Sequence, residues 1–175
     1  LTPTRILGLA FGVILVARNL ESVEQMVDLT NSLQACSPHS PLLISIDQEG
    51  GRVSRLPKGF TIFPPCDLIG RCNSTELAYA AAATIAKELR AVGVNMNMAP
   101  VLDVNSNPDN PVIGDRAFGT TPEVVWKLGL ATAAGVHDHK VLVCGKHFSG
   151  PRQTRGGFPQ RPPVASGPQG GGGGH

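Results

Sequence analysis

The chain has 175 residues, of which 41% are hydrophobic, and a mean hydropathy of +0.03. That is enough for one globular domain with a hydrophobic core. The formal net charge is +2, but three basic residues and no acidic ones fall in the last 25 positions. Residues 1–150 therefore carry 12 basic and 13 acidic side chains, which excludes the basic surface typical of a nucleic-acid-binding protein.

Neither a membrane span nor a metal or cofactor site is expected. The apolar run at residues 6–17 is shorter than the about 20 residues that a membrane-spanning helix needs. Only Arg5 precedes this run and no small-residue cleavage site follows it, so we expect no signal peptide. No CxxC pair occurs among the four cysteines, which argues against a zinc site. Unpaired cysteines fit a cytosolic location, although the sequence leaves the compartment open.

The first half of the chain predicts two strands, a helix and a long loop. Residues 12–17 (GVILVA) read as a strand. Ser22 is expected to cap a helix that runs to about Leu33, with Gln25 completing a capping box. Residues 42–46 (LLISI) predict the second strand, and the proline-containing residues 56–74 predict an irregular segment.

The second half predicts two further helices and two strands. Asn73 is expected to cap an alanine-rich helix over 75–92, with Gly93 at its end. Residues 94–98 predict the third strand, followed by a polar loop over 101–119. Pro122 is suited to the first position of a helix that runs to about residue 137. The fourth strand is expected at 141–144.

These elements predict an α/β fold with a parallel sheet. The four strands are apolar along their whole length and alternate with helices, which is typical of a parallel sheet covered by helices. Polar residues follow three strands, at Arg18-Asn19, at 47–55 and at Lys146-His147, and the remaining strand leads into the polar loop. Polar groups at the same end of successive strands are typical of the active face of a (β/α) barrel.

The last 25 residues differ in composition from the rest of the chain. Residues 151–175 contain 5 prolines and 8 glycines, and Val164 is their only aliphatic residue beyond alanine. Such a composition cannot support a packed core. We therefore divide the chain into a folded domain at residues 1–150 and a disordered tail at residues 151–175.

The densest group of functional side chains follows the second strand, where Asp47, Glu49, Arg52 and Arg55 lie within nine positions. Asp47 could accept hydrogen bonds from a pair of sugar hydroxyls while an arginine holds another oxygen. The alternative is an internal ion pair that fixes the loop, and the spacing leaves both interpretations open. Gly50 and Gly51 favour a tight turn with close backbone approach.

Other candidates are weaker from the residues alone. Most Asx residues of the polar loop are expected to serve its turns, and Arg116 is the better functional candidate there. Lys146 and His147 at a strand end are weak evidence by themselves. The His137-Asp138-His139 tripeptide is interpreted as solvated rather than metal-binding. Neither a glycine-rich phosphate loop nor a GxSxG nucleophile motif is present in the sequence.

Four segments together resemble one family. They are ILVARN (14–19), IDQEGGRVSRL (46–56), NMNMAPVLDVNSNPDNPVIGDRAFG (95–119) and GKHFSG (145–150). Over residues 5–150, their order and separation resemble the N-terminal barrel domain of glycoside hydrolase family 3, most of all its β-N-acetylglucosaminidase branch. The resemblance implies the first half of a (β/α)8 TIM-type barrel with four βα units.

The resemblance also implies an activity and a set of binding residues. The family cleaves β-linked sugars with retention of configuration by double displacement. Matched by motif, the residues implied to hold the terminal sugar are Asp47, Arg55, Arg116, Lys146 and His147. The implied partner is a carbohydrate, with no cofactor, metal, nucleic acid or membrane.

The chain departs from the family in two ways. In the acetylglucosaminidase branch the last motif runs Lys-His-Phe-Pro-Gly-His-Gly-Asp-Thr and leads to a histidine acid/base, whereas here the match stops at Gly150. The later strand that supplies the nucleophilic aspartate is also missing, since a full barrel needs ~250 residues. We therefore expect no catalytic residue within this chain, and the alternative function is an inactive fragment that retains at most sugar binding. A shifted reading frame or a mispredicted exon is our hypothesis for the tail.

Overall fold

The computed structural model describes residues 11–107, 109 and 111–147. Within them, four strands form one sheet: β1 (Gly12–Leu15), β2 (Leu43–Ile46), β3 (Met96–Asn97) and β4 (Leu142–Val143). The spatial order is β1-β2-β3-β4, and each neighbouring pair is parallel. The predicted α/β class is confirmed, and the sequential parallel order is the one expected for half of a (β/α)8 barrel. The predicted disordered tail at 151–175 lies outside the described residues.

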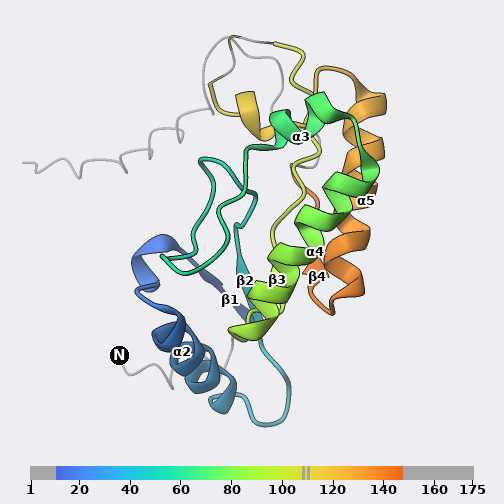
Figure 1. Ribbon diagram of the computed structural model, residues 1–175. Coiled ribbons are helices and arrows are strands. Elements are labelled where there is room, and N and C mark those ends of the chain that lie inside the picture. Colours follow the sequence, from blue (N-terminus) through green and yellow to red (C-terminus); the bar gives the residue numbers. More distant parts are fainter. Residues whose placement is uncertain (1–10, 108, 110, 148–175) are drawn as a thin grey trace, which may run out of the picture.

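Helices connect the strands. They are α2 (Val23–Ala35), α3 (Cys66–Cys72), α4 (Thr75–Ala91) and α5 (Pro122–Asp138), with short 3-10 turns η1 (Ala17–Asn19) and η2 (Gly114–Arg116). Figure 1 shows α4 and α5 side by side along one flank of the sheet, with α2 near its lower end. Within the ranges given above, none of these helices has the length and apolar character needed to cross a lipid bilayer.

The predicted helix starts are confirmed for α2 and α5, and the capping residue of α4 is corrected. Ser22 accepts a hydrogen bond from the Gln25 amide at 3.2 Å, as a capping serine should. Pro122 occupies the first turn of α5. The cap of α4 is Ser74, which accepts from the Leu77 amide at 3.1 Å. Asn73 lies one residue earlier, in the left-handed conformation that ends α3.

Helix α3 was not predicted, since residues 56–74 were expected to be irregular. It exists because of tertiary packing: Cys66, Ile69 and Gly70 are buried. Gly70 lies so close to the backbone of Phe118 that any side chain at this position would collide with it. A seven-residue helix with little periodicity of its own is stabilised mainly by such contacts rather than by helix propensity.

The strands are shorter than predicted. The first was expected to reach residue 17, but the chain leaves the sheet after Leu15 and Ala17 begins η1. The third and fourth strands each keep only two residues. Backbone pairing nevertheless continues past the assigned strands, because Val101 and Lys146 form a further parallel bridge. This bridge carries the register of the sheet up to the polar residues that follow β4.

The hydrophobic core lies between the sheet and its helices. Ile44, Ile46, Leu89 and Met26 are fully buried and join β2 to α4 and α2. A second cluster packs α3 against α4 and α5 around Phe118 and Leu128. On the opposite face of the sheet, one residue from each strand aligns in register: Ile14, Ser45, Met96 and Leu142.

Candidate functional site

A charged cluster lies at the carboxyl edge of the sheet. Asp47, Gln48 and Glu49 directly follow β2, and Lys146 and His147 lie just beyond β4. Because the strands are parallel, both segments leave the sheet at the same edge. The third contributor is Arg116, which ends the 3-10 turn η2 in the loop after β3. The structure therefore brings together four of the five binding residues that the sequence predicted.

Glu49 lies at the centre of this cluster. Its carboxylate accepts hydrogen bonds from Arg116 Nε and Nη2, each at 2.8 Å, in a two-pronged pair. Lys146 Nζ lies 2.6 Å from Oε1 of the same carboxylate. The Glu49 side chain is only 1% exposed. One buried carboxylate thus holds both cations of the site in place.

The charge state of Glu49 follows from these contacts. Burial alone would raise the pKa of Glu49, but the hydrogen bonds and charges of Arg116 and Lys146 outweigh it and leave the pKa below its ordinary value. The reciprocal effect is that the hydrogen bond to Glu49 raises the pKa of Arg116. Glu49 is therefore ionised near neutral pH, and its negative charge is compensated inside the protein.

Asp47 presents a carboxylate at the surface of the cluster. Its Oδ1 lies 2.5 Å from Lys146 Nζ, and its side chain is 30% exposed. Asp47 and Glu49 are two positions apart, and both carboxylates contact the same lysine. Lys146 has three N–H donors, so one remains for a ligand besides those directed at the two carboxylates.

His147 is oriented by a buried aspartate. The ring Nδ1 lies 2.6 Å from Asp103 Oδ2, and the His147 backbone amide donates to the same oxygen at 3.2 Å. In the neutral ring, a carboxylate acceptor at Nδ1 places the proton there and leaves Nε2 as an acceptor. The His147 side chain is partly exposed while Asp103 is buried. The cluster thus combines carboxylate and imidazole acceptors with a lysine donor.

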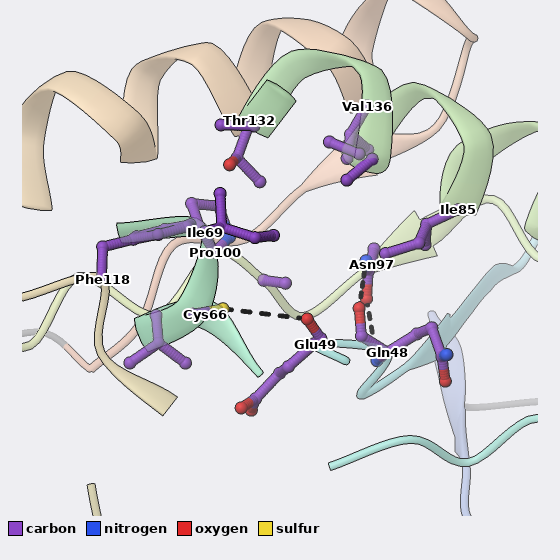
Figure 2. Close-up of a pocket in the computed structure, with 15 residues that line it drawn as sticks. Gln48, Glu49, Cys66, Ile69, Ile85, Asn97, Pro100, Phe118, Thr132 and Val136 are labelled. Atoms are coloured by element: carbon purple, nitrogen blue, oxygen red, sulfur yellow. Dashed lines mark hydrogen bonds between the residues drawn. The ribbon is translucent and has the colours of Figure 1, made fainter. Parts of the chain in front are cut away.

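A buried amide pair fixes the backbone that carries Asp47 and Glu49. The Asn97 side chain accepts from the Gln48 amide at 3.1 Å and donates to the Gln48 carbonyl at 2.9 Å (Figure 2). Gln48 Oε1 in turn accepts from the Arg55 backbone amide at 2.9 Å. Gly50 then turns the chain at a φ of 99°, and a Cβ there would lie 2.7 Å from the Pro64 carbonyl. Two-sided anchoring of this kind limits the motion of Asp47.

The two arginines after Asp47 have different environments. Arg52 pairs with Asp115 at 2.9 Å and donates to three successive carbonyls of residues 111–113, so it joins this loop to the loop after β3. The internal ion-pair interpretation therefore holds for Arg52. Arg55 is anchored through its backbone, and within the described chain its guanidinium has no hydrogen bond or ion pair. Its predicted role in binding stays a prediction.

A small apolar pocket lies beneath the site. Cys66, Ile69, Thr132 and Val136 line it, and Figure 2 shows the Glu49 carboxylate extending away from these side chains. With about 30 Å³ open to water-sized solutes, the pocket is too small for a sugar ring. Burial raises the pKa of the Cys66 thiol to about 12, and its Sγ lies 3.8 Å from the Glu49 carbonyl oxygen. Within the cluster, Asp47 and His147 are the side chains that remain partly exposed.

Sequence reasoning missed two residues of the site. The sequence places Glu49 in the charged group without indicating a role for it, and its two-residue spacing from Asp47 is the available signal. Asp103 was interpreted as one of many turn-forming Asx residues, and only the register of β3 against β4 brings it to His147. In the His137-Asp138-His139 tripeptide, Asp138 accepts a hydrogen bond from the Tyr79 hydroxyl at 2.9 Å. No metal-ligand group of three His, Cys, Asp or Glu side chains occurs in the part of the chain that the structure describes.

The sequence model described as "Glycosyl hydrolase family 3 N terminal domain" matches residues 5–167. The chain belongs to this family. The motif resemblance is therefore confirmed, and the match continues past Gly150 into the segment predicted to be a disordered tail. The division into two domains and the shifted-frame hypothesis stay predictions.

Curated relatives of the family 3 chain are named β-hexosaminidases. The Beta-hexosaminidase of Hydrogenovibrio crunogenus is 43% identical over 148 residues, which cover 81% of this chain and 41% of the relative. The Beta-hexosaminidase A of Pseudoalteromonas piscicida is 44% identical over 151 residues, covering 82% of this chain and 25% of the relative. The chain thus spans less than half the length of these relatives.

Solved structures of the family are similar to the described fold. A family 3 β-N-acetylglucosaminidase from Paenibacillus sp. matches with a TM-score of 0.77 and 48% identity, over 79% of this chain and 27% of that one. NagZ from Neisseria gonorrhoeae, in complex with N-trifluoroacetyl-D-glucosamine, matches with a TM-score of 0.78 and 35% identity. That match covers 86% of this chain and 48% of NagZ.

Proposed function

We propose that this chain forms the sugar-holding part of a retaining family 3 glycosidase that removes terminal β-linked N-acetylglucosamine. The relatives named above support the substrate class, and one of them is seen with a glucosamine derivative. The observation that carries the proposal is the convergence of Asp47, Glu49, Arg116, Lys146 and His147 at one sheet edge.

The chemistry of the cluster suits a ring with adjacent hydroxyl groups. A sugar hydroxyl both donates and accepts, so it is bound best where acceptors and donors alternate. Asp47 and His147 Nε2 offer acceptors, and Lys146 offers a donor between them. Arg116 is less exposed and is held by Glu49, so its contribution is to fix the electrostatic field of the site. These are positioning roles, which keep the sugar in a reactive orientation for groups supplied elsewhere.

For the 175-residue chain itself, we propose sugar binding without turnover. Double displacement needs a carboxylate nucleophile and an acid/base group on either side of the glycosidic bond. The motif match assigns Asp47 to binding, and Asp47 is paired with Lys146. Glu49 is buried and paired with two cations. A catalytically inactive fragment that retains sugar binding is thus the second function, and an experiment separates it from an active enzyme.

The test combines a turnover assay with a binding measurement. The 175-residue chain is incubated with a chromogenic β-N-acetylglucosaminide, and we expect no release of chromophore. The ¹⁵N-labelled chain is then titrated with N-acetylglucosamine and, separately, with glucose. We expect amide shifts at residues 47–49 and 146–147, larger for N-acetylglucosamine.

A pair of matched variants makes the binding measurement specific. Asp47→Asn removes a charge at the site, whereas Asp28→Asn removes an exposed charge on α2. We expect the sugar-induced shifts to disappear in the first variant and to persist in the second. Turnover that is abolished by Asp47→Ala would contradict the inactive-fragment proposal. Absence of shifts at millimolar sugar in a chain with native spectra would contradict the binding proposal.

A further inference from the structure

The turn after β2 carries two side chains that hold the loop after β3. The Glu49 amide donates to the Val53 carbonyl at 3.0 Å, and the Val53 amide donates to the Gly50 carbonyl at 3.2 Å, so two backbone hydrogen bonds close this turn. Glu49 pairs with the guanidinium of Arg116. Arg52 binds the backbone that directly precedes Arg116. One closed turn therefore holds Arg116 at two points.

Arg52 makes four contacts with the segment that leads to Arg116. Its Nη2 donates to the carbonyls of residues 111–113, at 3.0, 2.9 and 3.1 Å. Its Nε pairs with Asp115 at 2.9 Å. Three successive carbonyls can converge on one nitrogen only where the backbone turns around it, and this segment continues directly into η2. Arg52 therefore stabilises the turn from which the Arg116 side chain extends.

Arg52 and Arg116 share an acceptor. The Val112 carbonyl accepts from Arg52 Nη2 at 2.9 Å and from Arg116 Nη1 at 3.1 Å. Together with the two contacts to Glu49, this bond engages Arg116 at Nε, Nη1 and Nη2. Three contacts fix the plane of a rigid guanidinium, and among the described residues they use three of its five N–H groups. The direction of the remaining N–H groups therefore depends on where Arg52 holds the Val112 carbonyl.

The charges of the two segments are arranged reciprocally. Glu49 and Arg52 belong to the turn after β2, and Asp115 and Arg116 belong to the loop after β3. Each carboxylate pairs with the guanidinium of the other segment, which offsets the repulsion between two cations that share one carbonyl. The Arg52 and Asp115 side chains are 47% and 42% exposed, and a pair at such a surface contributes little to stability. Loss of Arg52 should therefore change the position of Arg116 without unfolding the chain.

We propose that Arg52 is a positioning residue for sugar binding, which acts by holding the Val112 carbonyl and so directs the guanidinium of Arg116 to the sugar. The proposal rests on the proposed function, in which the cluster holds a terminal sugar. Arg52→Lys is the variant that isolates this role. Lysine keeps the positive charge beside Asp115, but a single ammonium group cannot reproduce the planar fork that spans Asp115 and the carbonyls.

Titration of the ¹⁵N-labelled chain with N-acetylglucosamine measures the effect on binding. We expect Arg52→Lys to raise the dissociation constant about tenfold, the scale of one charge-assisted hydrogen bond. Arg71→Lys is the matched control, because Arg71 also pairs with an aspartate but does so at the exposed surface of α3. This control should bind the sugar as the wild type does. Equal affinity of Arg52→Lys and the wild type would overturn the proposal.

The guanidinium of Arg116 supplies a readout that needs no sugar. Its Nε–H donates to Glu49 at 2.8 Å and should give a slowly exchanging ¹⁵N signal. In the Arg52→Lys variant we expect this signal to shift and its hydrogen to exchange faster, while the amides of α4 and α5 keep their protection. An unchanged Arg116 signal would overturn the proposal, whether or not the sugar binds. Absence of binding in the wild type would instead contradict the proposed function, and the Arg116 signal would still decide the role of Arg52.

Discussion

At the scale of single residues, Glu49 determines how the site is organised. Its carboxylate engages Arg116 from the loop after β3 and Lys146 from the segment after β4. It therefore links three chain segments that are far apart in the sequence. Paired buried charges are costly to separate, because each partner left alone remains desolvated.

Replacing Glu49 by glutamine should be strongly destabilising. Glutamine preserves the shape of the side chain but leaves Arg116 and Lys146 as neighbouring positive charges. We expect the free energy of unfolding to fall by about 3–5 kcal/mol, the range for breaking a buried pair. Urea denaturation measures this, with Glu21→Gln on the exposed surface as the control. A loss no larger than in the control would show that the buried pair contributes nothing to stability.

The lowered pKa of Glu49 predicts how stability changes with acid. A carboxyl group with a folded-state pKa below its unfolded value of about 4.3 stabilises the protein fully above that pH. The stabilisation is then lost as the pH falls through the lower, folded-state pKa. The difference in unfolding free energy between the wild type and Glu49→Gln should therefore shrink steadily as the pH is lowered below about 4.3. Urea midpoints measured from neutral pH to pH ~3 test this, and parallel curves would contradict it.

Most of the site was predictable at this scale, and the rest depended on register. Asp47, Lys146 and His147 follow strand ends, so a parallel sheet places them together without further information. Asp103 reaches His147 only because Val101 pairs with Lys146, and strand register is not encoded in the local pattern. Which carboxylate is buried was equally hidden, because the burial of Glu49 depends on its contacts with Arg116 and Lys146 from distant segments.

At the scale of elements, the contact between α4 and α5 depends on a glycine. Gly135 is buried, and a Cβ at this position would lie 2.5 Å from the Tyr79 carbonyl and 3.1 Å from Ala82 Cβ. The two helices can approach this closely only because residue 135 has no side chain. Figure 1 shows them running alongside each other at this flank.

Gly135→Ala should therefore destabilise the protein despite the better helix propensity of alanine. Propensity alone would add about 1 kcal/mol of stability in a helix interior. The clash with the Tyr79 backbone should outweigh this gain and leave a net loss of about 1–3 kcal/mol. Ala134→Gly at the exposed neighbouring position is the control, and should show the propensity effect alone. A stabilised Gly135→Ala variant would mean that the helices separate at little cost.

The elements that sequence predicted well are those with a strong local signal. Ser22, Pro122 and the alanine-rich run place three helices to within about two residues. Helix α3 has no such signal, because its burial depends on Phe118 from a distant loop. The strands were predicted too long for a related reason: apolar residues such as Val94 and Val141 are buried without being part of the assigned strands.

At the scale of the whole molecule, the described strands form one sheet with helices packed on one of its faces. On the other face, Ile14 is 56% exposed and Leu142 is 48% exposed. The matched residues span less than half the length of the relatives named above. This face is therefore the one that would line the inside of a complete (β/α)8 barrel.

The rate at which the Cys66 thiol is alkylated should report how often the structure beneath the site opens. It is buried and its pKa is raised to about 12, so it is unreactive towards alkylating reagents while α3 stays in place. Cys72, at the other end of the same helix, is exposed and free. One labelling experiment therefore includes an internal reference. The alkylation rate of Cys72 measures the intrinsic reactivity of the reagent, and the alkylation rate of Cys66 measures how often α3 detaches from the protein. A ligand that rigidifies the loop from Asp47 to Glu49 should slow the second rate and leave the first unchanged.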